Sequence, residues 1–161
     1  NISYCAKCDG SLYNGKDVML IGNNKESEND AIYLSNIVNS LIYVNYSDDN
    51  VTFDKDNIKV INKKISNLNV NDEIIKTVTI DDKEYAIDGL FIENGYTPNI
   101  DFIKSLNIKL DNNYIVVDEN MKTNIDGIYA SGDIIKKKVY QIVTAASDGA
   151  IAALSIIKDL K

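Results

Sequence analysis

Two cysteines, Cys5 and Cys8, are the residues whose type and spacing most directly suggest chemistry in this chain of 161 residues. They are its only cysteines and stand in the segment Ser-Tyr-Cys-Ala-Lys-Cys-Asp-Gly. With two residues between them, one thiolate can attack a partner disulfide while the other resolves the mixed disulfide. Asp9 directly follows the pair and could deliver or accept the proton that thiol chemistry moves. The spacing therefore favours a redox-active dithiol with Asp9 as its acid–base group.

Two other interpretations of the cysteine pair are open. A zinc site needs four ligands, and a chain without histidine or further cysteines could supply them only with carboxylates or from a second copy. A structural disulfide would close a loop too short to constrain the unfolded chain, and a cytosolic compartment would tend to reduce it. Asp9 could likewise be a helix cap. We expect no metal in this chain.

The composition excludes several classes of function. All 17 basic residues are lysines, so no guanidinium group is available for bidentate binding of a phosphate. The absence of histidine excludes Ser-His-Asp and Cys-His catalysis within the chain. A net charge of −7 argues against a nucleic-acid partner. No apolar run approaches the ~20 residues that span a bilayer, so we expect no membrane association and a cytoplasmic location.

The elements after the cysteines resemble the start of a dinucleotide-binding unit. Residues 17–22 form an apolar run ending in glycine, which is typical of a buried parallel strand. Ser27 with Asp30 predicts a capping box at the start of a helix. Apolar residues at helical spacing follow at Ala31, Leu34, Ile37, Val38 and Leu41. A second strand is expected from residue 41, so the segment predicts a βαβ unit.

The turn between the first strand and the helix departs from the pattern that binds pyrophosphate. In G-x-G-x-x-G, glycines let the backbone approach the ligand at a helix N-terminus. Here only Gly22 is kept, and Asn24 and Ser27 hold the other two places. Glu26 and Glu28 add negative charge where a phosphate would lie. Binding of a nicotinamide cofactor is therefore disfavoured.

The second strand and its crossover depart from the pattern as well. Residues 45–49 contain none of the arginines with which an NADP enzyme holds the 2′-phosphate. Asp48 or Asp49 could still hold an NAD ribose, or the two could belong to a solvated loop. Residues 45–57 show no helical stripe before the next expected strand, 58–61, so the usual second helix is expected to be missing.

The remaining elements complete an α/β chain. An antiparallel meander is expected over 64–68, 74–80 and 83–87, and a strand over 90–92. Residues 95–99, with glycine and proline, suit a hinge or domain boundary. We then expect a short helix at 100–106, a hairpin turning at residues 112–113, a strand at 127–130 and a final helix. One face of that helix carries small and apolar residues, and the small ones would permit close backbone packing. The residues of this face are Val143, Ala146, Ala150, Ala153, Leu154 and Ile157.

Five segments together resemble, in order and spacing, the low-molecular-weight flavin thioredoxin reductases. They are Ser-Tyr-Cys-Ala-Lys-Cys-Asp-Gly, Ala-Ile-Tyr-Leu-Ser-Asn, Gly-Tyr-Thr-Pro-Asn, Gly-Ile-Tyr-Ala-Ser-Gly-Asp and Gln-Ile-Val-Thr-Ala-Ala-Ser-Asp-Gly-Ala. The resemblance implies a degenerate, Rossmann-like pyridine-nucleotide-binding domain with an antiparallel meander at residues 1–95. It implies the C-terminal portion of an FAD-binding domain at residues 96–161.

The resemblance also implies roles for individual residues. Cys8 would face the flavin, Cys5 would attack the disulfide of thioredoxin, and Asp9 would be the acid. FAD would be the cofactor of the complete protein. The positions that match flavin contacts are Gly132 and Asp133 at the ribityl chain and the backbone of Gln141 and Ile142 at the start of the final helix. Tyr140 stands where the family has arginine.

Two departures from the family shape the functional hypothesis. The N-terminal FAD-binding half is absent, so we expect a fragment of a protein that is a homodimer when complete, and we expect the fragment to be inactive without that half. The degraded nicotinamide motifs resemble the ferredoxin-dependent branch, which implies ferredoxin rather than NADPH as electron donor. Three lysines, 136–138, could steer an acidic ferredoxin, although basic residues are ordinary at this place in the family.

Three alternatives remain beside this hypothesis. A flavin-dependent dithiol oxidase would pass electrons from a substrate dithiol to oxygen and would also need no nicotinamide. A thioredoxin reductase that uses NAD(P)H through a divergent cofactor site is the second alternative. The third is a redox-inert module that binds thioredoxin, against which the retained cysteine pair argues.

Overall fold

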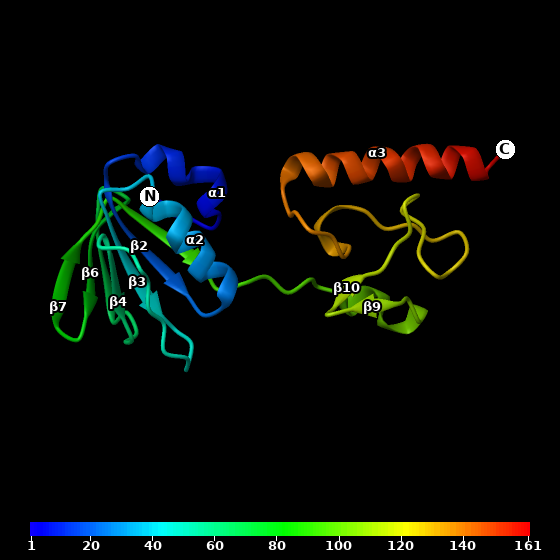
Figure 1. Ribbon diagram of the computed structural model, residues 1–161. Helices are drawn as coiled ribbons and strands as arrows, with labels where there is room; N and C mark the ends of the chain where they lie inside the picture. Colours follow the sequence, from blue (N-terminus) through cyan, green and yellow to red (C-terminus); the bar gives the residue numbers. More distant parts are fainter. The chain divides into compact units, whose positions relative to one another are not determined.

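The apolar run Asp17–Gly22 forms β2, the central strand of a five-stranded parallel sheet in the computed structural model, which describes residues 1–161. All of β2 except its first residue is buried, because layers cover both faces of the sheet. The strands lie in the order β1 (Ile2–Ser3), β8 (Gly89–Glu93), β2, β3 (Ser40–Asn45) and β4 (Ile58–Ile61). Residues 1–95 make one compact unit around this sheet, and residues 96–161 make a second (Figure 1).

Helices cover one face of the parallel sheet and a second, antiparallel sheet covers the other (Figure 1). The helical layer consists of α1 (Ala6–Asp9), the 3₁₀-helix η1 (Gly10–Tyr13) and α2 (Lys25–Ser35). The antiparallel layer consists of β5 (Asn67–Asn71), β6 (Ile74–Ile80) and β7 (Lys83–Ala86). The expected meander is formed, but its first strand is Asn67–Asn71 and not residues 64–68. Its side chains Ile75, Val78 and Ile80 pack against the parallel sheet.

The crossover from β3 to β4 contains no helix, as expected from residues 45–57. The two strands nevertheless pair in parallel, with Leu41 opposite Ile58. Val51 is buried in the helical-side core, and the ring of Phe53 lies edge-on to that of Tyr43 at 5.1 Å between centroids. Two apolar side chains of an irregular loop therefore contribute to the core on the face where a crossover helix normally packs.

The capping box expected from Ser27 and Asp30 is wrong. Helix α2 begins at Lys25 with Asn24 as its N-cap, and Ser27 is the third helical residue. The Asn24 side chain accepts the Ser27 N–H at 2.9 Å, and Ser27 Oγ accepts the Asn24 N–H at 3.3 Å. Asp30 lies further along the helix and is 5% exposed. The helix thus starts earlier than expected because Asn24 and Ser27 satisfy each other's backbone N–H groups.

The second unit contains little regular structure apart from its last helix. Its elements are η2 (Asp101–Leu106), β9 (Leu110–Asp111), β10 (Tyr114–Ile115), η3 (Gly132–Ile134) and α3 (Ile142–Asp159). The expected hairpin is confirmed, since Asn112 and Asn113 adopt φ values of 49° and 66° between two paired strands. Its apolar core includes the buried side chains of Ile103, Ile108, Ile115 and Ile135.

The strand expected over residues 127–130 is not formed. Tyr129 makes one isolated antiparallel bridge with Lys122. The Ala130 N–H donates to Met121 and the Thr123 N–H donates to Ile128, which closes residues 121–130 into a short loop. These backbone groups form hydrogen bonds within the loop, so a longer β-ladder is not formed.

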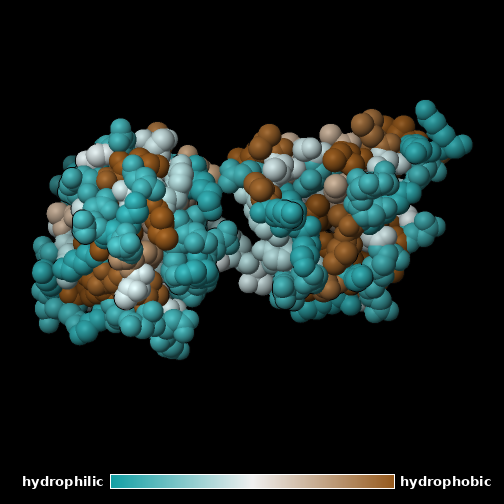
Figure 2. Space-filling view, in the orientation of Figure 1, coloured by the Kyte–Doolittle hydropathy of each residue, from teal (hydrophilic) through white to brown (hydrophobic).

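The apolar face of α3, which was expected to be packed, is exposed. Val143, Leu154 and Ile157 are 74%, 68% and 53% exposed, whereas the buried positions of the helix are Ala152 and Ser155. Figure 2 shows hydrophobic side chains gathered along this helix. Spacing predicted the helix correctly but not which face is covered.

No helix of the structure has the length and apolar character needed to cross a bilayer.

Replacing Gly22 by alanine is expected to destabilise the first unit. A Cβ atom at this position would lie 2.3 Å from Ser27 Oγ and 2.5 Å from the Tyr43 hydroxyl, both in the packed interior. We expect the opening free energy of β2 to fall by about 1–3 kcal/mol, as for other overpacked sites. Residue-resolved amide hydrogen exchange measures it.

Gly149→Ala is the matched control, because nothing lies within 4 Å of a Cβ built there in α3. It should stabilise that helix by about 0.5–1 kcal/mol. Equal exchange rates in β2 for Gly22→Ala and the unaltered chain would contradict the tight approach of α2 to β2.

Candidate functional site

The two cysteines lie at the start of α1, which follows β1: Cys5 immediately precedes the helix and Cys8 is its third residue. They are joined by a disulfide, with their Cα atoms 5.2 Å apart. Cys5 is the N-cap of α1, and its sulfur accepts the Cys8 N–H at 3.2 Å. Cys5 is half-buried and Cys8 is exposed. The pair is therefore held by backbone contacts at the carboxyl edge of the parallel sheet.

Asp9 is tied to the same turn through Ser3. The Ser3 hydroxyl donates to Asp9 Oδ2 at 2.8 Å and accepts the Cys5 N–H at 3.1 Å. Ser3 is 3% exposed, whereas Asp9 is half-buried. The structure thus brings Cys5, Cys8 and Asp9 together. Sequence reasoning missed Ser3, whose only signal is a hydroxyl residue two places before the first cysteine.

Glu93 is a second residue that sequence reasoning missed. It ends β8, is 8% exposed, and accepts the N–H of Ala6 through Oε1 at 2.8 Å. Burial is the main cause that raises the pKa of Glu93 to about 7. The hydrogen bond from Ala6 opposes this rise in pKa, and the negative charge of Asp30 adds to it. The signal in the sequence was an acid at the end of an apolar strand.

Lys7 and Asp30 form an ion pair beside Glu93. Lys7 Nζ lies 2.6 Å from Asp30 Oδ1, and their side chains are 54% and 6% exposed. The hydrogen bond to Asp30 raises the pKa of Lys7 despite some loss of solvation. The pair links α1, which carries Cys8, to α2, so the dithiol helix is anchored to the sheet through Glu93 and to α2 through Asp30.

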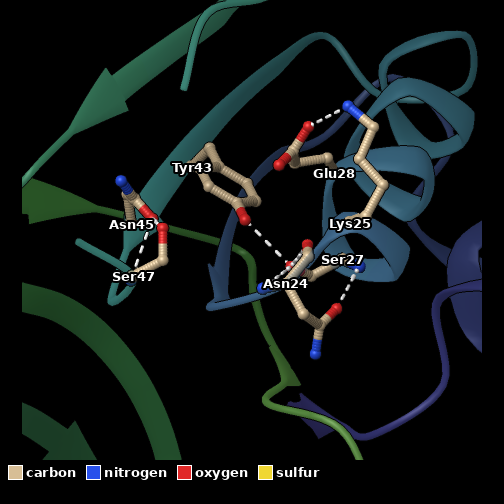
Figure 3. Close-up of polar contacts among 7 residues, drawn as sticks. All are labelled: Asn24, Lys25, Ser27, Glu28, Tyr43, Asn45 and Ser47. Carbon is tan, nitrogen blue, oxygen red and sulfur yellow. Dashed lines mark hydrogen bonds and ion pairs between the residues drawn. The ribbon is translucent and has the colours of Figure 1, made fainter. Parts of the chain in front are cut away.

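The turn that binds pyrophosphate in dinucleotide-binding units is closed by its own side chains (Figure 3). Ser27 Oγ donates to the Asn24 carbonyl at 2.7 Å and lies 2.9 Å from the buried hydroxyl of Tyr43. Lys25 pairs with Glu28 at 2.5 Å. Polar side chains thus stand where glycines would leave room for a phosphate, and the one lysine of the turn is paired with a carboxylate.

The end of β3 is also satisfied internally. Asn45 is 5% exposed, and its amide donates to the Asp49 carbonyl at 2.8 Å and to Asn62 Oδ1 at 3.0 Å. Its carbonyl oxygen accepts the N–H of Ser47 at 3.0 Å and the Ser47 hydroxyl at 2.8 Å (Figure 3). Asp48 and Asp49 are exposed, which fits a solvated loop.

The sequence-predicted flavin contacts lie in the second unit, where η3 packs against α3. Gly132 has a φ of +82°, a conformation that favours glycine, and Asp133 follows it. Gln141 is the N-cap of α3, and Ile142 is its first residue and 90% exposed. The two pairs of residues thus lie in two helical segments that pack against each other, with Gly132 facing Ala145 of α3.

Lys137 connects Asp133 to α3. Its Nζ lies 2.9 Å from Asp133 Oδ1 and 2.9 Å from Asp148 Oδ2, and its side chain is 13% exposed. Lys136 is paired with Asp111. Two of the three lysines proposed to steer a protein partner therefore have their charges matched by carboxylates within the unit.

These residues have the chemistry to hold a sugar-alcohol chain of FAD. The Asp133 side chain is 58% exposed, and one of its oxygens is paired with Lys137. The exposed carboxylate can accept hydrogen bonds from hydroxyl groups. The first turn of a long helix such as α3 has backbone N–H groups without partners within the helix. The partial positive charge of these groups favours an electron-rich ring nearby. The donor and acceptor set therefore fits a flavin.

Comparison with known proteins adds to this geometry. Residues 50–149 match the family described as pyridine nucleotide-disulphide oxidoreductase. The "34.2 kDa protein in rubredoxin operon" of Clostridium pasteurianum is 38% identical over 95% of this chain and 54% of that protein.

Two solved structures are similar over nearly the whole chain. Thioredoxin reductase from Streptococcus pyogenes superposes with a TM-score of 0.90 at 30% identity, over 99% of this chain and 57% of that one. A ferredoxin-flavin thioredoxin reductase from Clostridium acetobutylicum gives a TM-score of 0.56 at 31% identity, over 99% and 54% of the two chains.

The chain spans about half the length of the proteins that it matches. The parallel sheet with its antiparallel layer, and the second unit with α3, are the α/β fold of thioredoxin reductase. The match to this family runs from the β3–β4 crossover to the middle of α3. This chain therefore belongs to the pyridine nucleotide-disulphide oxidoreductase family.

Proposed function

We propose that this chain is the dithiol-bearing part of an FAD-dependent thioredoxin reductase. The observation that carries the proposal is the Cys5–Cys8 disulfide, held at the carboxyl edge of the sheet with Asp9 connected to it through Ser3. Similarity to a solved thioredoxin reductase over 99% of the chain supports it. In this proposal residues 1–95 are the nucleotide-binding-like domain and residues 96–161 are the C-terminal part of the FAD-binding domain.

The residues divide the reaction among them. Cys5 attacks the disulfide of thioredoxin, Cys8 resolves the mixed disulfide, and Asp9 moves the proton at the sulfurs. The side chain of Asp133 and the backbone of Gly132, Gln141 and Ile142 hold the flavin. FAD, when bound, supplies the two electrons that reduce the disulfide again.

We further propose that the electrons come from ferredoxin and not from NADPH. The side-chain contacts of Asn24, Ser27 and Tyr43 close the turn where pyrophosphate binds in dinucleotide-binding units. Glu26 adds negative charge there, and Glu28 neutralises Lys25. Similarity to the ferredoxin-flavin thioredoxin reductase from C. acetobutylicum supports the same donor. The lysine cluster does not, because Lys136 and Lys137 are paired with aspartates.

The cysteine roles predict which variant traps thioredoxin. Cys8→Ser keeps the attacking Cys5 and removes the group that resolves the mixed disulfide. With a single-cysteine thioredoxin whose thiol carries thionitrobenzoate, this variant should release thionitrobenzoate and form a covalent complex. We expect a rate at least about tenfold above that of Cys5→Ser, and absorbance of the released group together with non-reducing electrophoresis measures both.

Cys5→Ser is the matched control, since it also leaves one thiol in the same turn. Equal or faster trapping by Cys5→Ser would contradict the assignment of Cys5 as the attacking residue. Failure of both variants to form a complex would argue against a reductase and against a thioredoxin-binding module.

Asp9→Asn tests the acid–base role. The amide can still accept the Ser3 hydroxyl, so the turn should keep its geometry, but it cannot carry the proton. Because general acid–base catalysis contributes about 10²-fold or more, reduction of thioredoxin by the dithiol form should slow at least about tenfold. The rate is followed by rapid acid quench across pH, and an unchanged rate and pH profile would remove Asp9 from the reaction.

The donor proposal is tested in the complete flavoprotein under anaerobic conditions. Reduced ferredoxin should bleach the flavin, whereas NADPH and NADH should not do so on the same timescale. For the 161-residue chain we expect an NADPH dissociation constant weaker than about 1 mM by calorimetry. Fast bleaching by NADPH would overturn the donor proposal and leave the dithiol roles intact.

A further inference from the structure

Glu93 is a buried carboxylic acid at the dithiol for which the proposed reaction gives no role. It lies beside Gly22 in the sheet register, at the edge where β1 leads into the cysteine turn. Its Oε1 is 2.8 Å from the N–H of Ala6, the residue that separates Cys5 from Lys7. Because only 8% of Glu93 is exposed, water screens its charge poorly from the start of α1, where Cys5 is the N-cap.

The groups around Glu93 do not neutralise it. Helix α2 presents two acids, Asp30 and Glu26, and both disfavour a charge on Glu93. Helix α1 presents one cation, Lys7, which lies 2.6 Å from Asp30 and is paired with it. With Glu93 and Asp30 both ionised, the two buried carboxylates share a single ammonium group, so the local charge beside the dithiol is negative.

We propose that Glu93 is a positioning residue that fixes the start of the dithiol helix and whose negative charge opposes thiolate formation at Cys5 and Cys8. The inference rests on the proposed function only in treating the pair as a reducible dithiol. Reduction adds two electrons to the sulfur–sulfur bond, and two protons convert both sulfurs to thiols. A nearby anion favours this fully protonated product over one with a thiolate.

The consequence depends on pH in a defined direction. With the pKa of Glu93 near 7, its charge is present above neutrality and absent well below it. The charge therefore acts in the alkaline range, where thiols ionise. Removing it should make the dithiol more acidic, because a thiolate then forms without a buried anion beside it.

Glu93→Gln tests the charge and keeps an oxygen that can accept the Ala6 N–H. The full chain is reduced with dithiothreitol, which transfers two electrons and two protons to the disulfide and becomes a cyclic disulfide. After removal of the reductant, the rate of alkylation by iodoacetamide is measured against pH. The alkylation rate rises with pH as the thiols ionise, and we expect the pH at the midpoint of this rise to fall by about 0.5 to 1 unit in Glu93→Gln. Below the midpoint this corresponds to a threefold to tenfold larger fraction of thiolate.

Glu26→Gln is the matched control, since the charge of Glu26 also acts on Glu93 and on Lys7 but its side chain is exposed. Its midpoint should stay within about 0.2 pH unit of the unaltered chain, because solvent screens exposed charges. A Glu93→Gln midpoint equal to that of the unaltered chain would overturn the proposal, and so would an equal fall in Glu26→Gln.

Glu93→Met removes both the charge and the acceptor while keeping a similar length. It decides the question if Glu93→Gln fails to fold, and its midpoint should also fall. A fall in Glu93→Met together with no fall in Glu93→Gln would assign the effect to the hydrogen bond and overturn the role of the charge. If dithiothreitol does not reduce the pair in any variant, the proposed reductase function fails instead, so the two failures are distinguishable.

Discussion

The insertion of β8 between β1 and β2 is the constraint on which the candidate site depends. Parallel strands end at a common edge, so this pairing brings Glu93 beside Gly22 and within reach of the turn that follows β1. The cysteines belong to a helix of four residues, which cannot hold itself in place. Its position is set by contacts from Ser3, Glu93 and Asp30, each from a different element of the unit.

The polar groups at the same edge of the sheet are satisfied by side chains of the unit itself. In such folds glycines leave the helix N-terminus open, and that opening costs packing and backbone order. Here Ser27, Asn24 and Tyr43 fill the opening with hydrogen bonds among themselves. Asn45 does the same at the end of β3. Side chains of the unit itself therefore satisfy the polar groups at both of these strand ends.

The second unit shows the complementary case. Its small core is made by loops and the hairpin, and it leaves Val143, Leu154 and Ile157 of α3 exposed. Lys137, shared between Asp133 and Asp148, fixes η3 to the helix by charge and not by apolar burial. The segment that carries Asp133 is thus held to α3 by a mostly buried cation.

The sequence by itself predicted the α/β class, the buried parallel strand at residues 17–22, the antiparallel meander and the hairpin, because these depend on local periodicity and residue type. It did not predict the start of α2, the missing strand at residues 127–130 or the exposed face of α3, since each depends on which groups find partners in space. Only the tertiary structure brought Glu93 to the start of the helix that carries Cys8. Residue 93 is 85 or more positions away from the two cysteines in the chain, and strand order, which sequence spacing does not contain, decides that proximity.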